Sequence, residues 1–449
     1  MKNIITLSLL AMSLSGCGIY SSYQRPTDVV EVDSLYNYIE ATQESSNIAS
    51  LGWRELFTDP KLQSLIEAAL ERNSDLNVAR LNVEQAQIAL STARMAYLPS
   101  ISASADATAK SGSDMSYSLS ASASWEIDIF GKLRNAKEGQ KAALESSRAY
   151  AQSVQTSLIS TIANSYYTLV MLDDQLSISQ RTLTAWGQNI KTMEALMRAG
   201  RLNQTSVLQS KASKVALESS IVSIEEQISE LENTIGVLLM QPAQPIERGT
   251  IQDIKFPEHL SIGVPMELLS NRPDVQVAEY NLAKAFYATS EARSSLYPSI
   301  TIGGSVGFMD DSGKILAPQD YILSAVGSVV QPIFNQGRLR AELNISKLQQ
   351  EQAELEFAQS LYDAASEVNS AVISWQSAKS RLDFYTEQHA LLSDALRSAE
   401  LLMRHGNVTY LEVLTAQFTL LQCELNYSST IFDEVQGVIS LYHSLGGGR

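Results

Sequence analysis

Features that mark several common protein classes are scarce in this chain of 449 residues. It has two cysteines and four histidines, and its 33 basic residues are outnumbered by 49 acidic ones, giving a formal net charge of −16. Nucleic-acid binding needs a basic face, so this charge argues against it. No hydrophobic run of about twenty residues follows the N-terminal segment, so no transmembrane helix is expected. A membrane-inserted part would therefore consist of strands.

Catalytic and cofactor motifs are also scarce. The histidines lack the spacing of metal ligands, and no glycine-rich phosphate loop is present. Gly303-Gly-Ser-Val-Gly307 fits a hydrolase pattern, but that motif needs a turn between a strand and a helix, whereas Ser305 lies in an alternating strand pattern. His389 occupies the repeat position of Leu183, so we expect it to pack against a helix partner. The sequence predicts no enzyme, no cofactor and no metal site.

The N-terminus is typical of an exported protein. Residues 1–16 combine a basic start with a short apolar run, as in a secretory signal peptide. The segment ends in Leu-Ser-Gly before Cys17, which looks like a bacterial lipoprotein box, and the following Gly18 favours the outer membrane. The alternative is an ordinary signal peptide with a chance cysteine. With Cys17 acylated, Cys423 has no partner, so no internal disulfide is expected.

The chain repeats itself. The stretch from 131 to 208 recurs from 337 to 414 at an offset of 206, and each copy lacks proline over dozens of residues. Apolar residues spaced seven apart predict one very long coiled-coil helix in each copy. At about 1.5 Å per residue, such a helix would be roughly 100 Å long. A glycine, Gly200 or Gly406, then precedes a return helix with the same rhythm.

A different period precedes each long helix. Serines alternate with apolar residues from 116 to 125, and a similar pattern returns near 300–308. This alternation predicts hairpins at 100–127 and 299–332, with strands of about ten residues, as in membrane β-barrels. A soluble hairpin on a core is the alternative. Four strands cannot close a barrel alone, so a barrel would be shared between chains.

The sequence thus predicts an organisation in two repeats. It comprises a signal peptide (1–16), a lipidated tether and the start of an equatorial region (17–60), a first repeat (61–240, with long helix 131–198 and return helix 203–240), an equatorial insertion (241–271) and a second repeat (272–449, with long helix 337–404 and return helix 408–445).

Several stretches carry a resemblance to a known family. Leu56-Phe-Thr-Asp-Pro60, Leu268-Leu-Ser-Asn-Arg-Pro-Asp-Val275 and Ile333-Phe-Asn-Gln-Gly337 resemble the TolC-type outer membrane factor family, most closely its lipoprotein branch that serves drug-efflux pumps. The resemblance implies an α+β membrane protein: a homotrimer with a twelve-stranded β-barrel continued by a long α-helical barrel. A belt formed by residues 241–271 and the terminal segments would surround the helical barrel.

The resemblance also implies a function. It indicates a passive exit duct for small toxic compounds or drugs, anchored in outer-membrane lipid and joined through a periplasmic adaptor to an inner-membrane pump, a proton-driven drug exporter by preference. Protein secretion of type I, metal-ion efflux and a purely structural envelope lipoprotein are the alternatives.

The two helix turns are expected to form the periplasmic tip, where the adaptor docks. The predicted docking residues are Arg198, Gly200, Leu202, Val207, Leu208, Arg404, Gly406, Val408, Tyr410, Val413 and Leu414. Apolar residues there could instead begin the core of the return helices. Family members often carry an acidic gate residue where this chain has Thr415, so Leu411, Glu412 and Thr415 are predicted as the gate.

Overall fold

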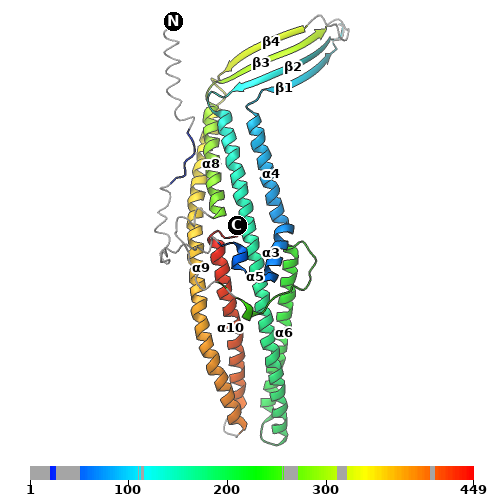
Figure 1. Ribbon diagram of the computed structural model, residues 1–449, viewed down its shortest axis with the longest axis vertical. Coiled ribbons are helices and arrows are strands. Elements are labelled where there is room, and N and C mark those ends of the chain that lie inside the picture. Colours follow the sequence, from blue (N-terminus) through cyan, green and yellow to red (C-terminus); the bar gives the residue numbers. More distant parts are fainter. Residues whose placement is uncertain are drawn as a thin grey trace. The chain divides into compact units, whose positions relative to one another are not determined.

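The computed structural model describes residues 21–26, 51–109, 111–112, 116–254, 256, 272–310, 321–404 and 410–448 (Figure 1). The first repeat contains α4 (Ser74–Met95), β1 (Ser100–Thr108), β2 (Ser116–Ile127), α5 (Lys132–Arg198) and α6 (Gln204–Leu238). The second contains α8 (Pro273–Ser294), β3 (Ser299–Asp310), β4 (Tyr321–Val330), α9 (Arg338–Arg404) and α10 (Tyr410–Ser444). Outside the repeats lie α2 (Trp53–Leu56), α3 (Pro60–Arg72) and the 3-10 helix η4 (Ile251–Asp253).

The two repeats have helices of equal length. α5 and α9 each contain 67 residues, and α6 and α10 each contain 35. Gly131 and Gly337 precede the long helices with φ of 73° and 80°, a conformation that glycine adopts without steric cost. The Asp128 carboxylate accepts hydrogen bonds from the N–H groups of Leu133 and Arg134, which satisfies donors at the start of α5. None of the described helices is long and apolar enough to cross a membrane.

The four strands form one antiparallel sheet in the order β1-β2-β3-β4. Its register aligns serines across all four strands, because Ser102 pairs with Ser122, Ser122 with Ser305, and Ser305 with Ser324. The side chains of Ser102 and Ser122 are hydrogen-bonded at 2.9 Å, and those of Ser305 and Ser324 at 2.7 Å. Since side chains alternate between faces, one face carries this polar row and the other carries neighbours such as Leu119. Ser305 lies within a strand, as expected, rather than at a hydrolase turn.

Packing divides the chain into two compact units that cut across the repeats. The first unit comprises Met1–Val30, Ala79–Ala151 and Asp274–Leu361, and the second comprises Glu31–Val78, Gln152–Pro273 and Tyr362–Arg449. Each unit draws on both repeats because α5 and α9 continue from one unit into the other. The division into a first and a second repeat therefore describes the sequence, whereas the packed units are mixed.

In the second unit α9, α10, α5 and α6 run alongside one another (Figure 1). One buried cluster joins three of these helices through Ile178 and Trp186 of α5, Leu217 of α6 and Leu421 of α10. Phe418 of α10 is half exposed and stacks on Trp186 at a ring distance of 5.9 Å. A large ring at the edge of this cluster can cover a buried tryptophan without entering the core.

Non-helical segments of the second unit converge on one stretch of α5. The Tyr166 hydroxyl donates to Asp59 and accepts from the Gly249 N–H at 2.9 Å. Burial, and then the Asp59 hydrogen bond, raise the pKa of Tyr166, so this hydroxyl remains a donor at neutral pH. Arg248 binds Asp173 of α5 at 2.5 Å and Glu232 of α6 at 2.6 Å.

The C-terminal segment reaches the same helix. The carbonyl oxygen of Gly448 accepts from Gln152 at 3.2 Å and from Gln155 at 3.0 Å. The segment before α3, the start of the 241–271 insertion and the C-terminus therefore all attach to α5 between residues 152 and 173. The remaining residues of that insertion, 255 and 257–271, lie outside the described residues.

Candidate functional site

The two predicted turn regions meet in one apolar cluster, which we term the tip cluster. Its buried members are Met193 of α5, Val207 of α6, and Tyr410 and Val413 of α10. Leu202, Met403 and Leu414 are partly buried against them. The ends of both helical hairpins are therefore held together by side chains that lie about 200 residues apart in the sequence.

Local geometry explains why the chain reverses next to this cluster. Gly200 has φ of 70°, and no atom lies near the position of a Cβ there, so its role is conformational. The Asn203 side chain accepts from the Ser206 N–H at 2.9 Å and so caps the start of α6. Burial is the main cause that raises the pKa of Tyr410, and a hydrogen bond with the Ser210 side chain partly offsets it.

The predicted docking residues divide into two groups. Val207, Tyr410 and Val413 are buried and Leu202 and Leu414 partly buried in the tip cluster, so they act as core, the alternative that the sequence left open. Arg198, Gly200 and Leu208 are exposed. Gly406, Val408 and the side chain of Arg404 lie outside the described residues, as does the proposed lipidation site Cys17. Docking itself stays a prediction for both groups.

The predicted gate residues lie in the first two turns of α10. Leu411, Glu412 and Thr415 are all exposed, and Thr415 donates to the Leu411 carbonyl oxygen at 2.9 Å. Because Leu411, Thr415 and Phe418 are spaced by four and three residues, they share one face of the helix. Phe418 was not among the predicted gate residues. Its exposed side chain extends this face by one turn beyond Thr415.

Further along the helices from the tip cluster, Glu424 of α10 contacts both α5 and α9. The Glu424 carboxylate lies 3.4 Å from Arg181 of α5 and 3.4 Å from the Nε2 atom of His389 of α9. His389 therefore contacts a neighbouring helix, as expected from its repeat position, and the contact is a polar one with Glu424. Among the described residues, no group of three or more histidine, cysteine, aspartate or glutamate side chains is placed to hold a metal ion.

The arrangement is that of a helical protein with two long helices, α5 and α9, and a four-stranded sheet with one polar row. Non-helical segments, which we term the loop belt, attach to α5 through Asp59, Gly249 and Gly448. Residues 65–239 and 264–447 match the outer membrane efflux protein family, so the chain belongs to this family of outer-membrane efflux proteins. This membership confirms the resemblance to TolC-type channels seen in the sequence and the predicted location in the outer membrane.

Three relatives illustrate the similarity. Cation efflux system protein CusC of Escherichia coli K12 is 27% identical over 456 residues, with 98% of each chain covered. A solved CusC structure has a TM-score of 0.84 and 26% identity, and covers 95% of this chain and 99% of that chain. Probable outer membrane lipoprotein SilC of Salmonella typhimurium is 27% identical over 459 residues, covering 98% of this chain and 99% of SilC.

A third relative is toluene efflux pump outer membrane protein TtgC of Pseudomonas putida. It is 27% identical over 470 residues, covering 100% of this chain and 96% of TtgC. The relatives cover nearly the whole chain, yet CusC is named for cations and TtgC for toluene, so the comparison defines the efflux class without a common substrate.

Proposed function

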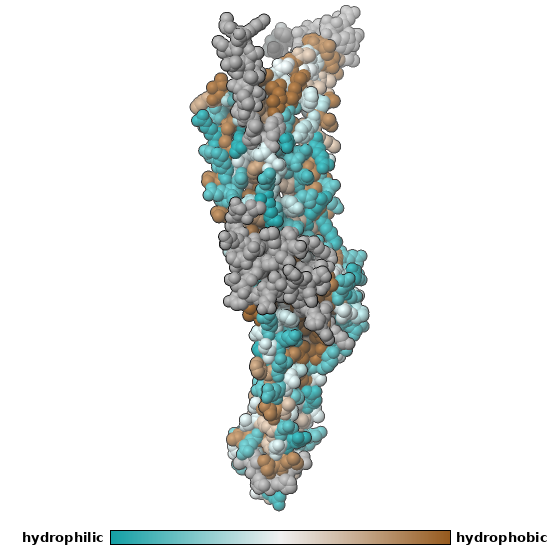
Figure 2. All heavy atoms as spheres, turned by 60° about the vertical axis from the view of Figure 1, so that its left-hand side comes forward, coloured by the Kyte–Doolittle hydropathy of each residue, from teal (hydrophilic) through white to brown (hydrophobic). Residues whose placement is uncertain are grey.

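We propose that three copies of this chain form the outer-membrane exit duct of a tripartite efflux pump. The duct would passively conduct small toxic compounds or drugs from a periplasmic adaptor and an inner-membrane pump to the exterior. The observation that carries this proposal is a set of unpaired surfaces in the single chain. The sheet has two terminal strands, and helices of both units carry exposed apolar stripes. Neighbouring copies in a trimer could cover all of them. Figure 2 shows one face, on which hydrophobic side chains are interspersed with hydrophilic ones.

The sheet supplies the first pair of edges. β1 and β4 are its terminal strands, so each has only one described strand neighbour. Unpaired backbone groups at such edges are costly in a membrane, where water cannot satisfy them. Pairing β1 of one copy with β4 of the next would give a closed barrel of twelve strands from three sheets of four. The serine row would then face a wet lumen and Leu119 would face lipid.

The helices supply a second pair of unpaired surfaces, one on α6 and one on α9. In the second unit, α6 and α9 flank α10 and α5 (Figure 1). α6 carries exposed Leu208, Val215 and Val222 at seven-residue spacing, and α9 carries exposed Phe384 and Leu391 at the same spacing. Seven-residue apolar stripes are typical of coiled-coil seams, and both of these stripes are exposed in the single chain. We infer that α6 of one copy packs against α9 of the next.

The first unit repeats this arrangement. α4 carries exposed Leu81, Ile88 and Met95 at seven-residue spacing, and α9 carries exposed Leu348 and Leu355. Apolar stripes on helices from both repeats are what a closed ring of alternating helices requires. A purely structural envelope lipoprotein that acts as a single chain would not require these exposed apolar stripes.

The substrate, the anchor and the docking surface complete the proposal. The alternatives are type I protein secretion and metal-ion efflux; CusC is named for cations and TtgC for toluene, and no feature of the described residues favours one of these. Cys17 would carry the lipid and supply a second anchor beside the barrel. The exposed residues of the turns, Arg198, Gly200 and Leu208, would contact the adaptor, with the tip cluster holding them in place.

Substitutions of the turn glycines test this proposal in cells that also make a cognate adaptor and inner-membrane pump. Gly200→Arg and Gly406→Arg should abolish efflux of a fluorescent dye, while trimers still assemble in the outer membrane. Gly200→Asn is the matched control, because asparagine tolerates positive φ better than other side chains, so efflux should persist. Normal pumping by Gly406→Arg would show that the turns are not the docking surface.

A further inference from the structure

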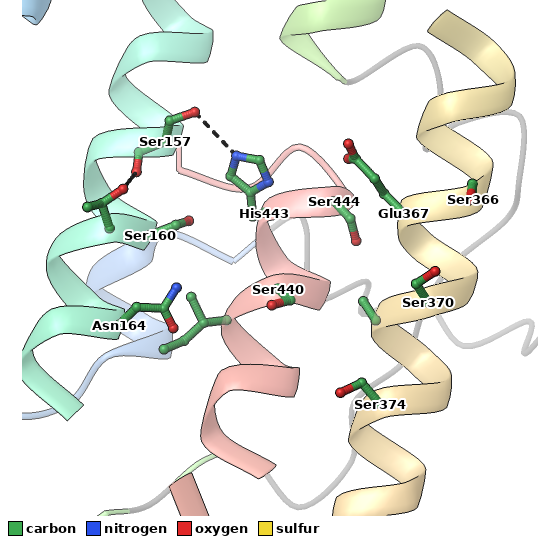
Figure 3. A pocket seen from close by; sticks show the side chains of 13 residues that line it. Ser157, Ser160, Asn164, Ser366, Glu367, Ser370, Ser374, Ser440, His443 and Ser444 are labelled. Atoms are coloured by element: carbon green, nitrogen blue, oxygen red, sulfur yellow. Dashed lines mark hydrogen bonds between the residues drawn. The ribbon is translucent and has the colours of Figure 1, made fainter. Parts of the chain in front are cut away.

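A cavity of about 630 Å³ opens between α5, α9 and α10 in the second unit (Figure 3). This volume is within the usual range for small-molecule sites. Its lining is dominated by hydroxyl groups on all three helices, with one amide, one imidazole and one carboxylate. The residues that decide its chemistry are Ser157, Ser160, Thr161 and Asn164 of α5, Glu367 of α9, and His443 of α10.

Two polar atoms in this cavity lack a partner among the described residues. Ser160 is 8% exposed, and its Oγ atom makes no hydrogen bond within the described chain. The Oδ1 atom of Asn164, one helical turn further along α5, is also buried and without a partner there. Figure 3 shows both side chains directed from α5 toward α10. Buried polar atoms without partners are rare and costly, so these two point to a ligand that supplies the missing hydrogen bonds.

The ligand must donate hydrogen bonds. The Thr161 hydroxyl already donates to the Ser157 carbonyl oxygen at 2.8 Å, and the Ser444 hydroxyl donates to the Leu441 carbonyl oxygen at 3.0 Å. These hydroxyls therefore offer lone pairs to the cavity, and the Asn164 Oδ1 atom can only accept. The cavity is consequently rich in acceptors.

The lining also contains one ionised acceptor. Glu367 is the one carboxylate in the lining, which contains no lysine or arginine. Arg272 binds Glu367 at 2.6 Å and offsets its charge, while the Glu367 side chain stays 53% exposed, so its carboxylate remains a hydrogen-bond acceptor at the cavity. Hydroxyl groups, an amide oxygen and one carboxylate together suit a protonated amine that also carries hydroxyl groups.

The cavity lies on the face of α5 away from the loop belt. Successive residues of a helix are rotated by roughly 100°, so Asn164 lies about 160° and Ser157 about 180° around the helix from Tyr166, which contacts the belt. In the proposed duct, the loop belt would lie on the outer surface of the tube. The opposite face of α5, with this cavity, would then face the lumen. Its location in a lumen thus rests on that proposed function, whereas binding does not.

We propose that this cavity is a binding site for solutes that carry a primary ammonium group beside hydroxyl groups, such as amino sugars. Ser160, Asn164 and the exposed Glu367 carboxylate accept hydrogen bonds from the ammonium group. A site in a duct must bind weakly enough to release its cargo, so it concentrates the solute without retaining it.

Equilibrium binding to the purified full chain in detergent tests this site, with glucosamine as the probe and glucose as its neutral analogue. Glucosamine should bind at least about tenfold more tightly than glucose, since hydrogen bonds to charged groups are the stronger ones. Ser160→Ala and Asn164→Ala, made separately, should each weaken glucosamine binding by about tenfold. Ser179→Ala is the matched control, because Ser179 is a buried serine of α5 whose Oγ atom also lacks a described partner but does not line the cavity.

Equal affinities for glucosamine and glucose would overturn the proposal, as would binding that neither cavity variant weakens. An equal loss in Ser179→Ala would overturn it as well, because the effect would then come from the helix and not from the cavity. The measurement needs no adaptor, pump or transport. Failure of binding and failure of the proposed efflux function are therefore distinguishable.

Discussion

Removal of one side chain from the tip cluster should loosen both helical hairpins. Met193 of α5 is 0% exposed and packs with Val207 of its own hairpin and with Tyr410 and Val413 of the other. Replacing a buried methionine by alanine typically costs 2–5 kcal/mol, so Met193→Ala should destabilise this cluster by about 3 kcal/mol. At about 1.4 kcal/mol per factor of ten, local opening should become roughly a hundredfold more frequent.

Hydrogen exchange on the intact protein measures this opening. In Met193→Ala, amides near Val207 in α6 and amides near Val413 in α10 should both exchange roughly a hundredfold faster. Lys191→Ala is the control: Lys191 is exposed two residues away on the same helix, and such surface changes usually stay within about 0.5 kcal/mol. If exchange accelerates in α6 but not in α10, the cluster does not couple the hairpins and our reasoning about the tip is wrong.

Three further predictions concern the strands, the anchor and one half-buried acid. In the assembled barrel, a membrane-impermeant thiol reagent should label Ser120→Cys through the pore while Leu119→Cys is reachable only from lipid; the reverse pattern would place the register in error. Cys17→Ser should lose labelled fatty acid, and continued acylation would refute lipidation at that residue. Burial raises the pKa of Glu291, with Lys132 partly offsetting and Glu342 adding to the effect, so its contribution to stability is lost as pH rises through the folded-state pKa. Glu291→Gln should therefore raise the thermal unfolding temperature at pH 7 but not at pH 4, and a drop at pH 7 would contradict this.

Local features of the sequence predicted the long helices and the strands. The repeat and the proline-free stretches located α5 and α9, which begin one residue after the expected starts at 131 and 337. Alternating serines located β2 and indicated its polar face. These features can be predicted because they depend on local sequence. The periodicity of side chains distinguishes helix from strand, and Gly131 and Gly200 allow the backbone conformations that the turns need.

Contacts between segments far apart in the chain could not be predicted from the sequence. Arg248 gives no sign in the sequence that it binds Asp173 and Glu232, and the heptad pattern could not show that Phe418 would stay half exposed on Trp186. The hydroxyl-lined cavity was missed for the same reason, since its lining comes from three helices whose serines read individually as solvated positions. A signal existed only in the spacing of Ser157, Thr161 and Asn164 along one face of α5.

The central claim, that neighbouring copies share one tube through α6 and α9, can be tested by disulfide trapping. Val215 of α6 and Leu391 of α9 are 62% and 64% exposed, and each lies 15 residues from its turn glycine (215 − 200 = 15; 406 − 391 = 15). Since the tip cluster holds the two turns together, these residues should face each other between copies at similar depth. The experiment is oxidation of the Val215→Cys, Leu391→Cys double variant in a Cys423→Ser background.

In the control pair Val215→Cys and Leu402→Cys, the second site is displaced by 11 residues (402 − 391 = 11), or roughly 16 Å along α9. A disulfide needs Cα atoms within about 7 Å, so the control should not cross-link. Our account predicts a covalent trimer on a denaturing gel for the first pair alone. Only uncrosslinked chains from that pair, in a protein that still reaches the outer membrane, would contradict the shared tube.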